Sequence, residues 1–179
     1  MHEQWSRVIL RRSSYQLINE LRPEMLNALE ISGDHYRRMN FKQYTSVQYP
    51  DYDVCVLPLN EQFDIIIAEQ VFEHLLWPYK AGKHVFQMLA DGGFFFISTP
   101  FLVRVHLFPN DCTRWTETGL KYFLAECGFS LEKIRTFSWG NRACITTNFS
   151  KWVRYKPGTH SLHNEPDFPY HVWALAQKD

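Results

Sequence analysis

The apolar residues of this chain gather in two continuous runs, FDIIIA at 63–68 and FFFIST at 94–99. Neither run alternates apolar and polar positions, and such continuity is typical of strands that are covered on both faces. Four further segments rich in strand-forming residues predict strands at 25–31, 41–47, 130–137 and 171–177. The pattern therefore predicts six strands spread along the whole chain.

Segments with helical signals lie between these strands. Thr116 is placed to cap a helix with one apolar face, and Gly128 is placed to end that helix in the left-handed conformation. Pro78 suits the first residue of a helix that reaches to about Ala90. Three other helices are expected: one capped by Ser13-Ser14, a short one at 34–39, and one from about Asn141.

Strands that alternate with helices predict an α/β fold with a mostly parallel sheet and helices on both faces. Only about 15 residues separate the second strand from FDIIIA, and the segment YPDYDVCVLP shows no helical period. We therefore expect a compact variant in which the helix after the second strand is missing. The length suits a single domain over 1–179, with a core and N-terminal helix at 13–140 and a C-terminal helix, loop and strand at 141–179.

Polar or small residues follow each of the first four strands. Ser32 and Gly33 follow the first, Gln48 follows the second, Glu69 and Gln70 follow the third, and Thr99-Pro100 follows the fourth. The carboxyl ends of parallel strands share one edge of a sheet, and ligands bind there. The sequence therefore predicts a ligand site at this edge.

Three segments in this order resemble the class I S-adenosylmethionine-dependent methyltransferases, in particular the methyltransferase 11-like group. They are ALEISGDHY, then FDIIIAEQVFEHLLWP with its D-x₆-V-x-E-H-x₃-P pattern, then MLADGGFFFISTPF. The later H-x-x-P-x-D-x-x-R-W-T segment, from His106 to Thr116, is similar to a subset of that group. The resemblance covers roughly residues 25–140 and implies a Rossmann-like sheet with an antiparallel last strand.

The resemblance also implies a cofactor and a reaction. S-adenosylmethionine would bind at the strand ends, and a methyl group would pass to an oxygen or nitrogen of a small molecule. The residues expected near the cofactor are Glu30, Ser32, Gly33, Gln48, Glu69 and Gln70. His74 and His106 are expected near the acceptor, where an imidazole can accept a proton near neutral pH. Either histidine could instead be a hydrogen-bonded structural residue, and Asp111 with Arg114 could be an ion pair that orders the loop.

A metal-dependent alternative uses part of the same segment. Gln70-x-x-Glu73-His74 together with His106 is similar to the E-x-x-E-H…H metal site of small-RNA 3′-end 2′-O-methyltransferases and of some ubiquinone-pathway O-methyltransferases. A glutamine stands where those sites have their first carboxylate, and hard cations prefer charged oxygens. We therefore expect no metal, while this alternative stays open.

Two other functions compete with methyl transfer. The first motif, Glu30-Ile31-Ser32-Gly33, holds one glycine where the family usually has several, so a methyltransferase-like binding or scaffold domain without turnover is an alternative. A nicotinamide-dependent oxidoreductase is disfavoured because the chain has no G-x-G-x-x-G segment to hold a pyrophosphate.

Composition adds constraints on partners and location. Lys plus Arg and Asp plus Glu number 19 each, so no net charge favours nucleic acid or an anionic membrane. The N-terminus lacks the features of a secretory signal, and no apolar run reaches membrane-spanning length. The four cysteines form no C-x-x-C pair, which suits reduced, mostly buried thiols in a cytoplasmic protein. Nothing in the sequence indicates an oligomeric state.

Overall fold

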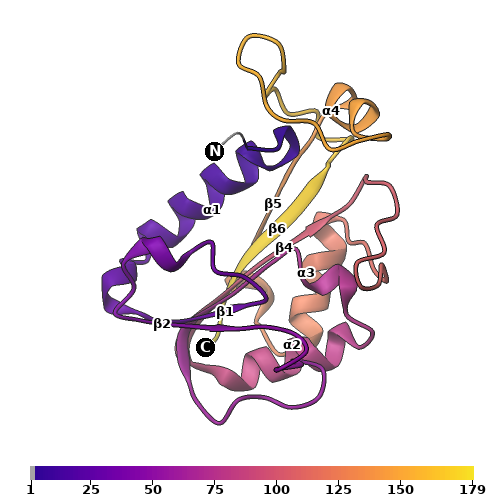
Figure 1. Ribbon diagram of the computed structural model, residues 1–179. Coiled ribbons are helices and arrows are strands. Elements are labelled where there is room, and N and C mark those ends of the chain that lie inside the picture. Colours follow the sequence, from indigo (N-terminus) through magenta and orange to yellow (C-terminus); the bar gives the residue numbers. More distant parts are fainter. Residues whose placement is uncertain (1–2) are drawn as a thin grey trace.

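The computed structural model describes residues 3–179 and shows a six-stranded sheet in the order β2-β1-β3-β4-β6-β5 (Figure 1). The strands are β1 (Asn27–Ile31), β2 (Gln43–Val47), β3 (Phe63–Glu69), β4 (Leu89–Pro100), β5 (Ile134–Trp139) and β6 (His171–Gln177). Each of the six strands expected from the sequence is present.

The first four strands run parallel, and β6 runs antiparallel to both of its neighbours, β4 and β5. This arrangement confirms the mostly parallel sheet with an antiparallel last strand. The chain leaves β1 toward β2 on one side and returns to β3 on the other, so the strand order reverses between β1 and β3. Ligands of open α/β sheets bind outside the carboxyl ends of the strands at such a point.

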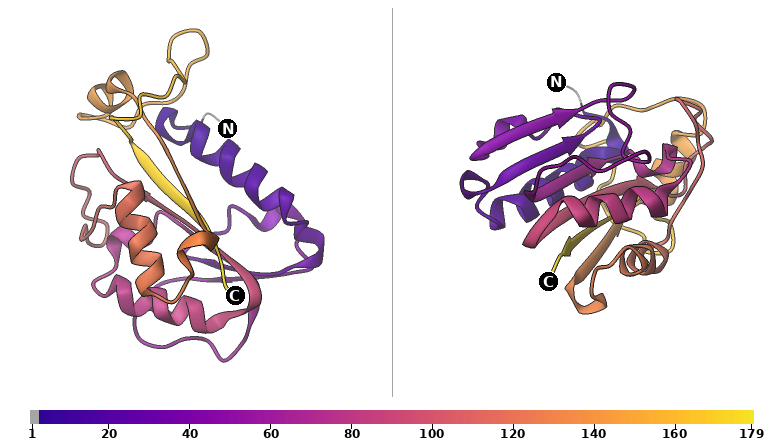
Figure 2. Two further views of the ribbon diagram at one scale, coloured as in Figure 1. Left: turned by 180° about the vertical axis from the view of Figure 1, so that it is seen from behind. Right: turned by 90° about the horizontal axis from the view of Figure 1, so that it is seen from below.

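Helices cover both faces of the sheet, as expected (Figures 1 and 2). One face is packed by α1 (Val8–Glu20), and the opposite face by α2 (Pro78–Met88) and α3 (Glu117–Glu126). The short α4 (Arg142–Thr147) lies beyond the sheet edge where β6 begins. Two apolar cores result, one between the sheet and α2 with α3, the other between the sheet and α1.

The segment between Gln48 and Phe63 contains turns and no helix, which confirms the missing helix. At 34–39 the expected short helix is a single 3₁₀ turn, Arg37–Met39. The chain covers β1 and β2 here with a loop rather than with an α-helix, so this end of the sheet holds less secondary structure than the other.

Side-chain caps start two helices, and the one at Thr116 was predicted. Thr116 Oγ1 accepts a hydrogen bond from the Gly119 amide, and Asn141 Oδ1 accepts one from the Cys144 amide. Gly128 has a φ of 122°, in the region that favours glycine. Asp91, Gly92 and Gly93 lie within β4, where the pairing register with β3 shifts between Phe63 and Ile65.

The start of the first helix was predicted wrongly. It begins at Val8 and not after Ser13-Ser14, so both serines lie inside it. Their hydroxyl groups hydrogen bond elsewhere: Ser14 donates to the Arg11 carbonyl, and Ser13 accepts from the Trp173 indole. A serine inside a helix that bonds to a carbonyl or to another element has the same local sequence signature as a cap.

Within residues 3–179, no helix combines the length and the apolar character needed to cross a membrane. All four cysteines are free, and Cys112 alone among them is exposed.

Candidate active site at the strand ends

Two residues leave their strands in an unusual backbone conformation. Ser32 follows β1 with a φ of 56°, and Gln70 follows β3 with a φ of 58°. The Ser32 amide still donates to the Val47 carbonyl, and the Gln70 amide to the Ser98 carbonyl. Non-glycine residues rarely adopt positive φ, and those that do cluster at functional sites. Both turns lie at the edge where the sequence predicts ligand binding.

The carboxylate of Glu30 is buried beneath the loop after β1. It accepts hydrogen bonds from the amides of His35 and Tyr36, both at 3.0 Å, and from the Tyr44 hydroxyl at 2.5 Å. A side chain at Gly33 would collide with this carboxylate, which explains the single glycine of the first motif. Glu30 therefore orders its own loop, and its expected contact with the cofactor stays a prediction.

Ser32, Gly33 and Gln48 form an accessible polar rim above β1 and β2. Ser32 and Gln48 are exposed, while Gly33 is half-buried. The Gln48 side-chain amide donates to the Gly33 carbonyl at 3.3 Å, and the Ser46 hydroxyl donates to that same carbonyl. Because Ser32 and Gln48 are exposed, the Gln48 side-chain oxygen and the Ser32 hydroxyl are groups of the rim that can hydrogen bond ribose hydroxyls.

Glu69, at the end of β3, has a side chain that is 3% exposed. Its Oε1 lies 3.2 Å from the Arg7 guanidinium and 3.9 Å from that of Arg11, and its Oε2 accepts from the Tyr36 hydroxyl at 2.7 Å. Glu69 thus ties the N-terminal segment and the loop after β1 to the central strand. Gln70 beside it donates to the Ser98 hydroxyl at 3.2 Å.

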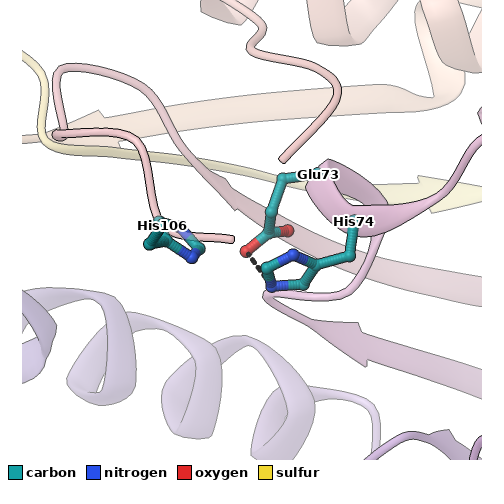
Figure 3. A group of neighbouring side chains, drawn as sticks. All are labelled: Glu73, His74 and His106. Carbon is teal, nitrogen blue, oxygen red and sulfur yellow. Dashed lines mark ion pairs between the residues drawn. The ribbon is translucent and has the colours of Figure 1, made fainter. Parts of the chain in front are cut away.

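Glu73, His74 and His106 form a compact cluster beyond β3 (Figure 3). One ligand atom from each residue lies within 4.8 Å of the others, and His74 Nε2 is 3.7 Å from Glu73 Oε1. The Glu73 carboxylate points between the two imidazole rings, whose centroids are 5.0 Å apart. The two histidines expected near an acceptor are therefore neighbours.

The loop that carries His106 is fastened to this cluster. The Cys112 amide donates to the Glu73 carbonyl at 2.7 Å, and His74 Nδ1 faces the Asn110 carbonyl at 2.5 Å. Because a carbonyl only accepts, His74 Nδ1 carries a proton, and in the neutral ring Nε2 presents its lone pair to the cluster. Asp111 pairs with Arg114 and accepts from the His106 amide, so the ion pair expected to order the loop is present.

Burial sets the protonation of the cluster. Desolvation raises the pKa of Glu73 to about 8, because the buried carboxylate lacks a hydrogen-bond partner among the described residues. Desolvation lowers the pKa of His106, partly offset by Asp111. At neutral pH, Glu73 is therefore mostly protonated and His106 is neutral, which leaves the imidazole able to accept a proton.

A cavity of about 300 Å³ opens beside the cluster. Several polar atoms that line it or lie at its wall are buried and find no partner within residues 3–179: both ring nitrogens of His171, the Tyr170 hydroxyl, and the carboxylate of Glu73. Burial lowers the pKa of His171 well below its usual value, so this ring is neutral. Buried polar groups normally have partners. These groups fit a polar ligand inside the cavity.

The cavity residues that sequence reasoning missed include Arg7, Tyr170 and His171. Arg7 precedes the first helix, in a segment given no functional role. His171 could have been found, because an antiparallel last strand begins at the edge where the parallel strands end. Its register partner is Pro100, the last residue of β4.

The cluster also has the donor set of a metal site. One carboxylate and two imidazoles are ligands that zinc and other transition metals accept. Gln70, the fourth member of the metal alternative, lines the same cavity, and its side-chain NH2 group donates to Ser98. Glu73, His74 and His106 are the residues whose ligand atoms lie within 4.8 Å of one another.

A family profile described as "Methyltransferase domain" matches residues 7–138. A comparison with curated protein sequences gives no match. Solved structures share the fold at low identity. An S-adenosylmethionine-dependent methyltransferase from Thermotoga maritima, described as a possible histamine N-methyltransferase, has a TM-score of 0.59 at 12% identity and covers 98% of both chains.

Two further structures are similar over most of this chain. One is an S-adenosylmethionine-dependent methyltransferase from Mesorhizobium loti, with a TM-score of 0.54 at 15% identity over 91% of this chain and 96% of that one. The other is phosphoethanolamine N-methyltransferase 2 from Haemonchus contortus in complex with S-adenosyl-L-methionine, with a TM-score of 0.60 at 10% identity over 93% and 52% of the respective chains. The profile match, together with this sheet, shows that the chain belongs to the class I S-adenosylmethionine-dependent methyltransferases and that S-adenosylmethionine is its cofactor.

Proposed function

We propose that this protein transfers the methyl group of S-adenosylmethionine to an oxygen or nitrogen of a small molecule. The observation that carries the proposal is the cavity of about 300 Å³ at the strand ends, with buried polar atoms that have no partner within residues 3–179. A cavity of this volume suits a small acceptor, and its polar walls suit hydroxyl or amino groups. An acceptor that reacts at carbon would not need them.

The cofactor residues are proposed to be those of the rim: Ser32, Gly33 and Gln48 beside β1 and β2, with Glu30 beneath them and Glu69 and Gln70 at the end of β3. When bound, the sulfonium cofactor supplies an electrophilic methyl group. The protein aligns the acceptor with that group and removes its proton.

His106 is proposed to accept the proton from the attacking hydroxyl or amine, as the bond from oxygen or nitrogen to carbon forms and the bond from carbon to sulfur breaks. Its lowered pKa keeps the ring neutral at physiological pH. His74 presents the unprotonated Nε2 toward the same cluster and is proposed to orient the acceptor. Protonated Glu73 can donate a hydrogen bond to the acceptor.

The metal-dependent version is a second candidate, because one ligand atom each from Glu73, His74 and His106 lies within 4.8 Å of the others. An ion there would replace the proton on Glu73 and would lower the pKa of a bound hydroxyl. In that version the three residues hold the ion, and His106 is no general base.

The test is transfer of labelled methyl groups to a panel of small hydroxyl and amino compounds, with and without a chelator. We expect transfer to some members at oxygen or nitrogen, unaffected by the chelator. Loss of transfer on chelation, restored by a divalent ion, would favour the metal version. Binding of cofactor without transfer to any compound would favour the scaffold alternative.

The free thiols support a proposed cytoplasmic location.

A further inference from the structure

A second depression lies outside the cavity described above, on the exposed side of α1. Its volume is about 780 Å³, and it lies between the N-terminal part of α1 and the loop after β1. Its lining includes Arg7, Arg11, Arg12, Tyr15, His35 and Arg38. We call it the arginine groove.

The arginine groove concentrates positive charge in a protein whose net charge is zero. Four guanidinium groups line it. Arg7 pairs with Glu69, and Arg11 lies within 4.0 Å of both Glu69 and Glu3. Arg12 and Arg38 are exposed, and neither forms an ion pair with any carboxylate of residues 3–179. Arg38 donates from Nε to the His35 carbonyl at 3.5 Å, so the terminal nitrogens of both guanidinium groups remain available to an anion.

The spacing of the groove residues also suits a bound group. Arg7, Arg11 and Tyr15 recur every four residues along one face of the helical segment, and Arg38 approaches from the facing loop with its guanidinium 5.8 Å from the centre of the Tyr15 ring. Planar guanidinium groups on two walls can contact the oxygens of one carboxylate or phosphate from both sides.

The arginine groove borders the acceptor cavity, because Gln4 and Arg7 line both. Its lining does not include Ser32, Gly33 or Gln48 of the rim, although His35 and Arg38 come from the loop that begins with Ser32 and Gly33. An anion in the groove would lie beside Arg7, which also lines the cavity that contains Glu73, His74 and His106.

We propose that the arginine groove binds the anionic group of the methyl acceptor, so that the acceptor is a small carboxylate or phosphate ester that carries a hydroxyl or amino group. Its anion contacts Arg12 and Arg38, and its nucleophile passes Arg7 into the inner cavity. This inference rests on the proposed function and adds the class of acceptor to it.

The test uses inorganic phosphate, phenyl phosphate, phenol and S-adenosylhomocysteine as probes, each titrated by calorimetry at constant ionic strength. The variants are Arg12→Gln with Arg38→Gln, and Arg135→Gln as the matched control, since Arg135 is an exposed arginine on β5 far along the chain from the groove. These are exposed positions, so the fold should be kept; far-UV circular dichroism checks it.

We expect both phosphates to bind the wild type, and the double variant to bind them about tenfold more weakly or worse, since charge-assisted hydrogen bonds are lost. Phenyl phosphate should bind several-fold tighter than inorganic phosphate or phenol, because its ring enters the inner cavity. S-adenosylhomocysteine should bind all three proteins alike, and the control should match the wild type.

The inference would be overturned if the double variant bound the phosphates as tightly as the wild type does. It would also be overturned if the wild type bound phenyl phosphate no more tightly than inorganic phosphate. A loss of S-adenosylhomocysteine affinity in the double variant would also overturn it, since the groove would then hold the carboxylate of the cofactor. The proposed function fails separately, through absence of S-adenosylhomocysteine binding to the wild type.

Discussion

His106 and Glu73 have opposite pKa shifts with a common cause, because burial disfavours whichever form carries charge. The neutral imidazole and the mostly protonated carboxyl group lie side by side at neutral pH. This pairing gives the cluster a proton acceptor and a hydrogen-bond donor without a charge on either of the two groups. The chemistry assigned to each residue can be tested singly.

His106→Ala should lower turnover by roughly 10²–10⁴-fold while the affinity for cofactor stays almost unchanged, because a general base acts only on the acceptor. In the wild type, the rate should fall on the acid side with a midpoint below the usual 6.5, since burial lowers the pKa of His106. Steady-state kinetics across pH measures both effects, and His163→Ala at an exposed loop histidine is the control. Full turnover in His106→Ala would exclude both proposed roles of His106, as general base and as metal ligand.

Glu73→Gln tests the buried carboxyl group through stability. The folded pKa of about 8 exceeds the ordinary value of 4.5, so the stability that protonated Glu73 contributes is complete below pH 4.5 and is lost as pH rises through 8. Above pH 8 the variant, which has no proton to lose, should melt at a higher temperature than the chelator-treated wild type. The difference in the free energy of unfolding should be on the order of a few kcal/mol. A variant that is less stable at every pH would contradict the assignment.

At the scale of elements, the loop at 34–40 stands where a helix would usually follow the first strand. It is held by Glu30, which accepts from two of its amides and from Tyr44, and by Tyr36, which is fully buried. The loop in turn forms one wall of the arginine groove through His35 and Arg38. One buried carboxylate therefore supports a large part of this end of the molecule.

Glu30→Ala should destabilise the fold by about 2–4 kcal/mol, because two amides and a hydroxyl lose their acceptor. The amides of His35 and Tyr36 should exchange hydrogen much faster than in the wild type, which mass spectrometry after exchange can measure. Asp34→Ala, at an exposed position of the same loop, is the control and should change little. Unchanged exchange at His35 and Tyr36 would show that other contacts hold the loop.

Structural features that depend only on neighbouring residues in the chain, such as buried strands and helix caps, were predictable from the sequence. Continuous apolar runs predicted β3 and β4, because a strand buried on both faces needs no polar positions, and Thr116 caps its helix as expected. The false cap at Ser13-Ser14 shows the limit: both hydroxyls serve contacts inside or beyond the helix, one of them with Trp173 from the far end of the chain. Such a use leaves no local signal.

At the scale of the whole molecule, one part of the candidate site was predictable from the sequence and another part was not. The rim at the ends of β1, β2 and β3 was predictable, because parallel strands end at a shared edge. His171, Tyr170 and Arg7 were not found, because they reach the cavity from segments that are 60 or more residues away from Glu73 in the sequence. Their contribution depends on how β6 and the N-terminal segment pack, which only the assembled fold determines.

The central claim, that these strand ends bind S-adenosylmethionine for methyl transfer, is tested most directly by thermal unfolding with S-adenosylhomocysteine, the product form of the cofactor. At 100 times its dissociation constant the ligand should stabilise the wild type by about 2.7 kcal/mol and raise the melting temperature. The shift should grow with ligand concentration, and adenosine without the amino-acid part should give a smaller one at equal concentration. No shift and no heat of binding at millimolar S-adenosylhomocysteine would contradict the account.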